Sequence, residues 1–175
     1  MVFLTPQGQT FNQDKAWELS QLQNLILICG RYEGVDERVR EELVDEELSI
    51  GDYVLNGGEV PAMAVVEAVV RLLPEVLGDE DSVASDSFYQ GLLDHPHYTR
   101  PEEFAGRRVP PVLLSGDHKR IDRWRKKERL RQTFIKRPDL LQEAQLSPEE
   151  QELLEQIKIE IRDGLDGKED SNEKY

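Results

Sequence analysis

The segment LILICGRYEG, residues 25–34, passes from five apolar residues directly into a glycine-rich turn. A short apolar run that stops at a glycine is typical of a buried β-strand. Amphipathic stretches flank it, at residues 13–23 and again after Asp36, and both are predicted to be helices. This alternation of strand and helix predicts an α/β fold.

Further elements follow the same alternation. Short strands are predicted at residues 2–4 and 50–55, and a helix at residues 62–73 ends before Pro74. That helix carries apolar residues over most of its surface, so we expect it to be largely buried. The single cysteine, Cys29, closes an apolar run and is predicted to be a buried, unreactive thiol.

Three loops place glycine or proline at the end of a predicted strand: LTPQG (residues 4–8), CGRYEG (residues 29–34) and IGDYVLNGGE (residues 50–59). Ligands of open α/β sheets bind beyond the carboxyl ends of strands, where glycines let backbone amides approach closely. Each loop by itself could equally be a tight turn. Neither GxxxxGK[ST] nor GxGxxG is present, which argues against nucleotide hydrolysis.

The charge is distributed unevenly along the chain. The formal net charge is −14, and residues 1–106 carry 6 Lys and Arg against 21 Asp and Glu. Residues 107–137 carry 12 against 3. Such a basic block fits an RNA backbone footprint, although it could also be a solvated helix face. No run approaches the roughly 20 apolar residues of a spanning helix, so we expect a cytoplasmic chain without membrane contact.

The acidic, small-residue stretch at residues 78–87 predicts a domain boundary. Beyond it, Ser115 can cap a basic helix that runs toward Thr133. A capping box at Ser147 starts a last helix that ends near Ile161. The predicted organisation is a domain over residues 1–78, a mobile acidic linker over 79–95, a helical domain over 96–162 and a disordered tail over 163–175.

Five strings occur in a specific order: LTPQG, CGRYEGVDERV, SIGDYVLNGGE, DSF and HPHYTRPEEF. Together they resemble the signature of the bacterial tRNA (guanine-N1)-methyltransferases, the TrmD family, over about residues 2–141. The resemblance implies a SPOUT-type methyltransferase domain with a trefoil knot, N-terminally incomplete, followed by a small α-helical C-terminal domain. It also implies a homodimer that transfers a methyl group from S-adenosylmethionine to N1 of the guanine immediately 3′ of the tRNA anticodon, position 37.

The resemblance assigns roles to individual residues. The methyl-donor pocket would be formed by Phe3, Leu4, Thr5, Pro6, Gly30, Tyr32, Glu33, Ile50, Gly51, Asp52, Tyr53, Val54, Leu55, Gly57 and Gly58. The tRNA anticodon stem-loop would contact His97, Arg100, Arg123, Arg125, Lys126, Lys127 and Arg131. Trp124 is expected to pack the basic helix inward, as a core residue, rather than to stack on a base.

Methylation of guanine N1 requires a general base, because that nitrogen carries a proton. Asp86 of the DSF string matches the family's catalytic aspartate, and Arg71 matches an arginine that would stabilise charge near the guanine O6. The alternatives are that Asp86 caps the segment after it and that Arg71 pairs with Glu67, four residues earlier on a helix.

Metal binding has little support in the sequence. His95 and His97 flank Pro96, but no third ligand occurs at a useful spacing, and no metal-ligating residue is assigned. Some family members depend on magnesium, so the resemblance also implies a candidate site for Mg²⁺, bound by oxygen ligands, near Glu33 or Asp86. The family also has sequence before the point that matches Val2, and this leaves an alternative function, a non-catalytic RNA-binding remnant that uses the basic helix.

Overall fold

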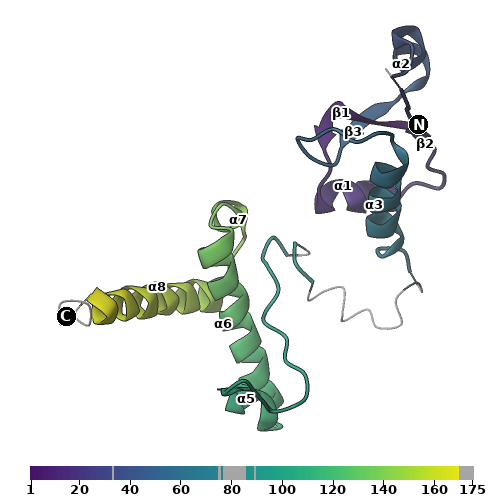
Figure 1. The fold of residues 1–175 in the computed structure, drawn as a ribbon. Coiled ribbons are helices and arrows are strands. Elements are labelled where there is room, and N and C mark those ends of the chain that lie inside the picture. The colour runs from purple at the N-terminus through teal and green to yellow at the C-terminus, as the bar shows by residue number, and fades with distance from the viewer. Residues whose placement is uncertain (33, 75, 77–85, 89, 170–175) are drawn as a thin grey trace. The chain divides into compact units, whose positions relative to one another are not determined.

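The chain divides into two compact units, Met1–Val83 and Ala84–Tyr175. The computed structural model describes residues 1–32, 34–74, 76, 86–88 and 90–169 (Figure 1). The break between the units falls inside the segment predicted to be a linker, and the domain boundaries themselves stay predictions. Among the described residues, no helix is long and apolar enough to cross a membrane.

The first unit is built on a parallel sheet with strand order β2-β1-β3. Its strands are β1 (Val2–Thr10), β2 (Leu27–Cys29) and β3 (Glu46–Ser49). Phe3 on the central strand is in register with Ile28 on β2 and with Glu47 on β3. Parallel pairing of strands joined by helices confirms the predicted α/β character of this unit.

Two of the helices that the structure describes in this unit cover one face of this sheet. They are α1 (Gln13–Ser20) and α3 (Glu59–Val70), which lie side by side in Figure 1, and α2 (Glu37–Leu43) follows β2. Asn12 and Asp36 cap α1 and α2 by accepting hydrogen bonds from backbone amides. The core between sheet and helices contains Val2, Leu4, Ala16, Leu19, Leu48, Val65 and Val69.

Three predictions for this unit were wrong. The strand predicted at residues 50–55 is a loop, because the chain bends at Gly51, whose φ is 147°. The helix predicted to be largely buried, α3, buries Val65 and Val69 but exposes Val66 and Val70. Its apolar pattern is continuous, but only one of its faces meets the sheet and α1. Cys29 is also exposed.

The second unit is mainly helical (Figure 1). A short antiparallel hairpin, β4 (Glu103–Phe104) with β5 (Arg107–Arg108), precedes four helices. These are α5 (Pro111–Leu114), α6 (His118–Lys136), α7 (Leu140–Glu143) and α8 (Pro148–Glu169). Helix α6 packs against the other three, and the core contains Leu92, Leu130, Leu153 and Ile157.

The ends of the long helices differ from prediction in two places. The cap of α6 is Asp117, whose side chain accepts a hydrogen bond from the Arg120 amide at 3.2 Å. The Ser115 hydroxyl instead accepts a hydrogen bond from the Asp117 amide. Helix α8 continues to Glu169, whereas a disordered tail was predicted from residue 163. Glycine weakens a helix by about 1 kcal/mol but, unlike proline, keeps every backbone hydrogen bond, so Gly164 does not end it.

The predicted capping box is present at the start of α8. The Ser147 amide donates to the Glu150 carboxylate at 2.9 Å, and the Glu150 amide donates back to the Ser147 hydroxyl at 3.4 Å. We expect Ser147→Ala to lower the free energy of unfolding of this unit by about 1 kcal/mol. Urea denaturation followed by circular dichroism measures this loss. Gln145→Ala, on the exposed loop before the cap, is the matched control, and equal midpoints for the two variants would contradict the prediction.

Candidate active site and nucleic-acid interface

A shallow cavity of about 150 Å³ lies in the first unit, beside the end of β2 and the start of α3. Seven residues predicted to bind the methyl donor line it: Phe3, Leu4, Gly30, Tyr32, Leu55, Gly57 and Gly58. Four further residues line the same cavity and were missed: Arg31, Gly34, Asn56 and Pro61. The two glycine-rich loops, which the resemblance assigned to one pocket, therefore line one cavity together with the start of β1.

Backbone contacts hold the two loops together. The Gly58 amide donates to the Gly30 carbonyl at 3.0 Å, and Arg31 pairs with Gly57 in an antiparallel bridge. The Arg31 guanidinium also donates to the Glu59 carboxylate at 2.6 Å. This hydrogen bond lowers the pKa of Glu59 below its ordinary value. The loops thus form one structure, although they are separated in the sequence.

The close approach of the loops depends on glycine. A Cβ atom at Gly58 would lie 2.7 Å from the Cα atom of Cys29, and one at Gly30 would lie 3.2 Å from the Phe3 ring. The first distance is shorter than packed carbon atoms allow. Gly58 is also the N-cap of α3 and makes no side-chain cap hydrogen bond to the first backbone amides of this helix.

The other residues predicted for the donor pocket do not line this cavity. Thr5 and Pro6 lie in an irregular part of β1, where pairing with β3 is interrupted between Leu4 and Gln9. The remainder lie in the loop after β3: Ile50, Gly51, Asp52, Tyr53 and Val54. Glu33 lies outside the described residues. A donor-binding role for these residues stays a prediction.

The predicted catalytic residues occupy different units. Arg71 is the exposed C-cap of α3, and its amide donates to the Glu67 carbonyl at 3.3 Å. Asp86 is half-buried at the start of the described part of the second unit. The two residues after it contact the rest of this unit. The Ser87 hydroxyl accepts a hydrogen bond from the Asp94 amide at 2.9 Å, and the Arg137 guanidinium carbon lies 5.9 Å from the centre of the Phe88 ring. The roles of Asp86 and Arg71 in the reaction stay predictions.

A larger cavity, of about 710 Å³, lies in the second unit. Three residues predicted to contact RNA line it, namely His97, Arg100 and Arg125. Trp124 lines it too and is only half-buried, so the prediction that it packs into the core was wrong. Its ring lies 6.3 Å from those of His95 and Tyr98, measured between centroids. Aromatic rings and arginines at one cavity are a combination that binds nucleic-acid bases and phosphates.

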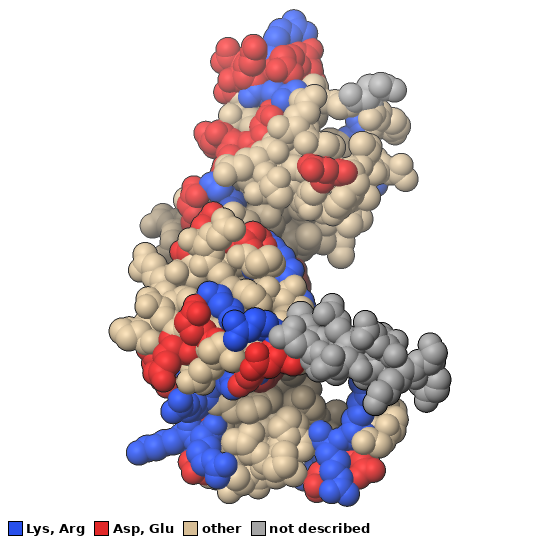
Figure 2. Space-filling model, turned by 90° about the vertical axis from the view of Figure 1, so that its left-hand side faces the viewer, with Lys and Arg blue, Asp and Glu red and all other residues tan. Residues whose placement is uncertain are grey.

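Ion pairs to α8 occupy part of the basic helix α6. Lys127 contacts Glu160 at 2.5 Å, Arg131 contacts the same carboxylate, and Lys126 contacts Glu149 at 2.9 Å. These pairs join α6 to α8 and neutralise charge that was assigned to RNA contact. Arg123 and Arg125 are exposed, and the nearest carboxylate oxygen to Arg125 belongs to Asp122 at 3.8 Å. Figure 2 shows Lys and Arg gathered at its lower end, at the level of α5 and the first half of α6.

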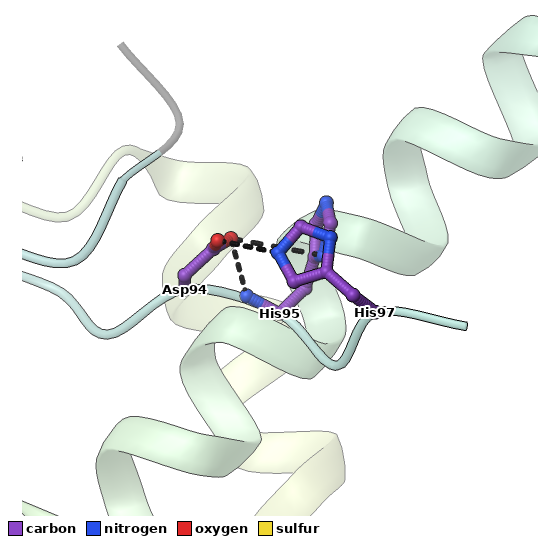
Figure 3. Close-up of side chains that lie close together, drawn as sticks. All are labelled: Asp94, His95 and His97. Carbon is purple, nitrogen blue, oxygen red and sulfur yellow. Dashed lines mark hydrogen bonds and ion pairs between the residues drawn. The ribbon is translucent and has the colours of Figure 1, made fainter. Parts of the chain in front are cut away.

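A cluster missed in the sequence lies beside the larger cavity. Asp94, His95 and His97 direct side-chain atoms toward one another (Figure 3), and one such atom from each lies within 4.8 Å of the others. Burial lowers the pKa of His95, although the Asp94 carboxylate opposes this. Burial opposes ionisation of Asp94, but hydrogen bonds from His97 and the His95 amide outweigh it, so the pKa of Asp94 is lowered. Asp94 was not considered as a partner of the two histidines.

The fold and the cavities define a two-unit protein, in which a parallel α/β unit carries a small glycine-lined cavity and a helical unit carries a basic, aromatic cavity. The family model for tRNA (guanine-1)-methyltransferase TrmD matches residues 1–143, and the chain belongs to this family. This confirms the resemblance found in the five sequence strings.

Individual relatives agree with the family. A tRNA (guanine-N(1)-)-methyltransferase of Dictyoglomus turgidum is 58% identical over 163 residues, which are 93% of this chain and 66% of the relative. Enzymes of the same name from Bacillus cereus and Bacillus anthracis are 58% identical over 158 residues, 90% of this chain and 65% of each relative. The chain therefore spans about two thirds of the length of these curated relatives.

Proposed function

We propose that this chain acts in S-adenosylmethionine-dependent methylation of N1 of guanine 37 in tRNA. The observation that carries the proposal is the cavity formed jointly by the CGRYEG and VLNGGE loops, the strings on which the family resemblance rests. The basic cavity of the second unit supplies a surface suited to the RNA substrate. A purely RNA-binding remnant would have no need for the glycine-dependent packing of the first unit, so the enzymatic function is favoured.

The residues of the smaller cavity fit S-adenosylmethionine in kind. Backbone groups of Gly30, Gly57 and Gly58 can bind its polar atoms, and Phe3 and Pro61 provide apolar walls. Its volume, about 150 Å³, is below the roughly 300–1,000 Å³ of ordinary ligand pockets, so these residues would enclose only part of the donor. The loop at residues 50–54 is proposed to complete the pocket.

The donor, when bound, supplies an electrophilic methyl group on a positively charged sulfur. The chain itself must remove the proton from guanine N1, and we assign this step to the Asp86 carboxylate. The half-buried position of Asp86 suits a general base that is covered by the target nucleotide. Arg71 is assigned to the developing negative charge near O6, which makes loss of the N1 proton easier.

The tRNA anticodon stem-loop is proposed to bind the basic surface of the second unit. We expect Arg125→Gln to weaken tRNA binding about fivefold to tenfold at low salt, because Arg125 is an exposed cation at the cavity. The slope of the logarithm of the binding constant against the logarithm of the salt concentration should fall in magnitude by about one. Fluorescence anisotropy with labelled tRNA, repeated over a salt series, measures both.

The matched control for this prediction is Lys127→Gln, which removes the same charge from a side chain already paired with Glu160. Its effect on affinity is expected to be smaller. An equal or larger loss for Lys127→Gln would contradict the assignment of the cavity as the RNA-binding surface.

Other properties of the family are proposed with the activity. They are a homodimer, a SPOUT-type trefoil knot, a cytoplasmic location and Mg²⁺ as a second cofactor, bound by oxygen ligands near Asp86 or Glu33. Donor binding can be measured without tRNA and without an intact dimer. The donor can therefore be tested first and alone.

Calorimetric titration of S-adenosylmethionine into the 175-residue chain tests the proposal. A saturable signal with one donor per chain is expected, followed by methyl transfer to a tRNA transcript that carries guanine at position 37. A transcript with adenine at that position is the control and should accept no methyl group. If the folded chain binds tRNA but no donor, the RNA-binding remnant becomes the better account.

A further inference from the structure

We propose that Asp94, His95 and His97 form a binding site for a late first-row divalent metal ion such as Zn²⁺. The ligands would be one carboxylate oxygen and two imidazole nitrogens. Two of the three residues, His95 and His97, line the larger cavity of the second unit, and the site takes no part in the proposed methyl transfer. It requires neither donor nor tRNA.

The distances within the cluster suit a tetrahedral ion. Zn–N and Zn–O bonds of about 2.0–2.2 Å place neighbouring ligand atoms roughly 3.4 Å apart. His97 Nε2 lies 2.7 Å from Asp94 Oδ2, and His95 Nδ1 lies 3.7 Å from Asp94 Oδ1. These two separations end on different oxygens of the carboxylate and lie on either side of the required value, and Figure 3 shows the three side chains converging. One side-chain nitrogen or oxygen from each of the three residues lies within 4.8 Å of the others, so binding of one ion requires side-chain rotations that shorten the longest of these distances.

His95 has a nitrogen that needs a partner. Its side chain is only 10% exposed, and its Nδ1 atom is buried without a hydrogen bond to any residue that the structure describes. Buried polar atoms are nearly always paired, so an orphaned one requires an explanation. A metal ion at Nδ1, shared with the Asp94 carboxylate, supplies the missing interaction.

The main chain around the cluster is fixed in advance. The Leu93 amide donates to the hydroxyl of Thr133, a fully buried residue of α6, at 2.9 Å. The Asp94 amide donates to Ser87, and the neighbouring Leu92 belongs to the core of this unit. Asp94 and His95 thus belong to or directly follow a segment whose main chain is already held in place. Little conformational entropy is therefore lost when the ion binds.

The ligand set distinguishes this ion from Mg²⁺. Magnesium prefers oxygen ligands in octahedral geometry, whereas imidazole nitrogens favour Zn²⁺, Co²⁺ and Ni²⁺. With three protein ligands, a fourth coordination position stays available to water. His95 and His97 also line the larger cavity, so that position is accessible from solvent.

Titration of Co²⁺ and Zn²⁺ into the full 175-residue chain tests this site. We expect one Co²⁺ per chain, visible-range absorption typical of tetrahedral coordination, and displacement of Co²⁺ by Zn²⁺ but not by Mg²⁺. Asp94→Asn, His95→Ala and His97→Ala should each weaken Zn²⁺ binding at least about tenfold. His118→Ala, at the only remaining histidine, is the matched control and should bind as the unchanged chain does.

The Co²⁺ spectrum of the unchanged chain keeps the test valid if a variant fails to fold. Octahedral Co²⁺, absence of saturable binding, or an equal loss for His118→Ala would each overturn the proposal. Because no donor or tRNA is present, these results are independent of the methyltransferase assay.

Discussion

Replacing Asp86 with alanine is expected to reduce methyl transfer to tRNA by about 10² to 10⁴-fold and to leave the affinity for S-adenosylmethionine unchanged. The lone pair of guanine N1 cannot attack the methyl group until its proton leaves, and Asp86 is the carboxylate assigned to accept that proton. The glycines assigned to donor binding belong to the first unit, whereas Asp86 follows in the second. Single-turnover methylation and calorimetry measure the two effects separately.

The matched control is Asp163→Asn, at an exposed carboxylate on α8 whose ion pair is with the neighbouring Arg162. It should leave both quantities unchanged. If Asp86→Ala instead weakened donor binding as much as it slowed methylation, Asp86 would have a positioning or structural role. If it changed neither, another group would have to be the base.

Local chemistry decided which parts of the fold could be predicted. Asp36 and Ser147 were recognised as helix starts because a cap depends on residues within one turn, and the structure confirms both. The loop at residues 50–55 was mistaken for a strand, because its apolar residues match a strand and the backbone bend at Gly51 does not appear in that pattern. Likewise, periodicity could not reveal that, among the described residues of the first unit, α3 buries Val65 and Val69 but exposes Val66 and Val70.

The candidate sites show the same limit. The family resemblance, not the glycines by themselves, placed Gly30 and Gly58 in one pocket, and they do lie together. The ion pair between Arg31 and Glu59 joins residues 28 apart and has no local pattern. Lys127 and Arg131 were assigned to RNA because the sequence shows their charge but not their partner, Glu160 on α8.

The cluster of Asp94, His95 and His97 was missed for a different reason. Its three residues are almost adjacent, and neither a helix nor a strand places all three on one face, because Asp94 and His95 are consecutive. Pro96 excludes regular helix here, and the irregular chain turns the carboxylate back toward both imidazoles. Metal-ligand spacings taken from regular elements do not apply to such a segment.

Gly58→Val is expected to weaken S-adenosylmethionine binding by about a hundredfold. A Cβ atom alone would lie 2.7 Å from the Cys29 Cα atom, and valine adds two further carbons at a point where backbone faces backbone. Overpacking of this kind typically costs about 1–3 kcal/mol, and a backbone contact can be relieved only by moving the loops apart. That movement breaks the hydrogen bond from the Gly58 amide to the Gly30 carbonyl and opens the cavity.

Calorimetry measures this loss, and circular dichroism establishes that the variant is folded. Gly164→Ala is the matched control, because a Cβ atom there meets no heavy atom within 4 Å and the residue lies in helix α8. Alanine at that position should leave donor binding unchanged and stabilise the helix by up to about 1 kcal/mol. Donor binding by folded Gly58→Val at the affinity of the unchanged chain would show that the ligand does not depend on the contact between the two loops, and the donor site would have to be placed elsewhere.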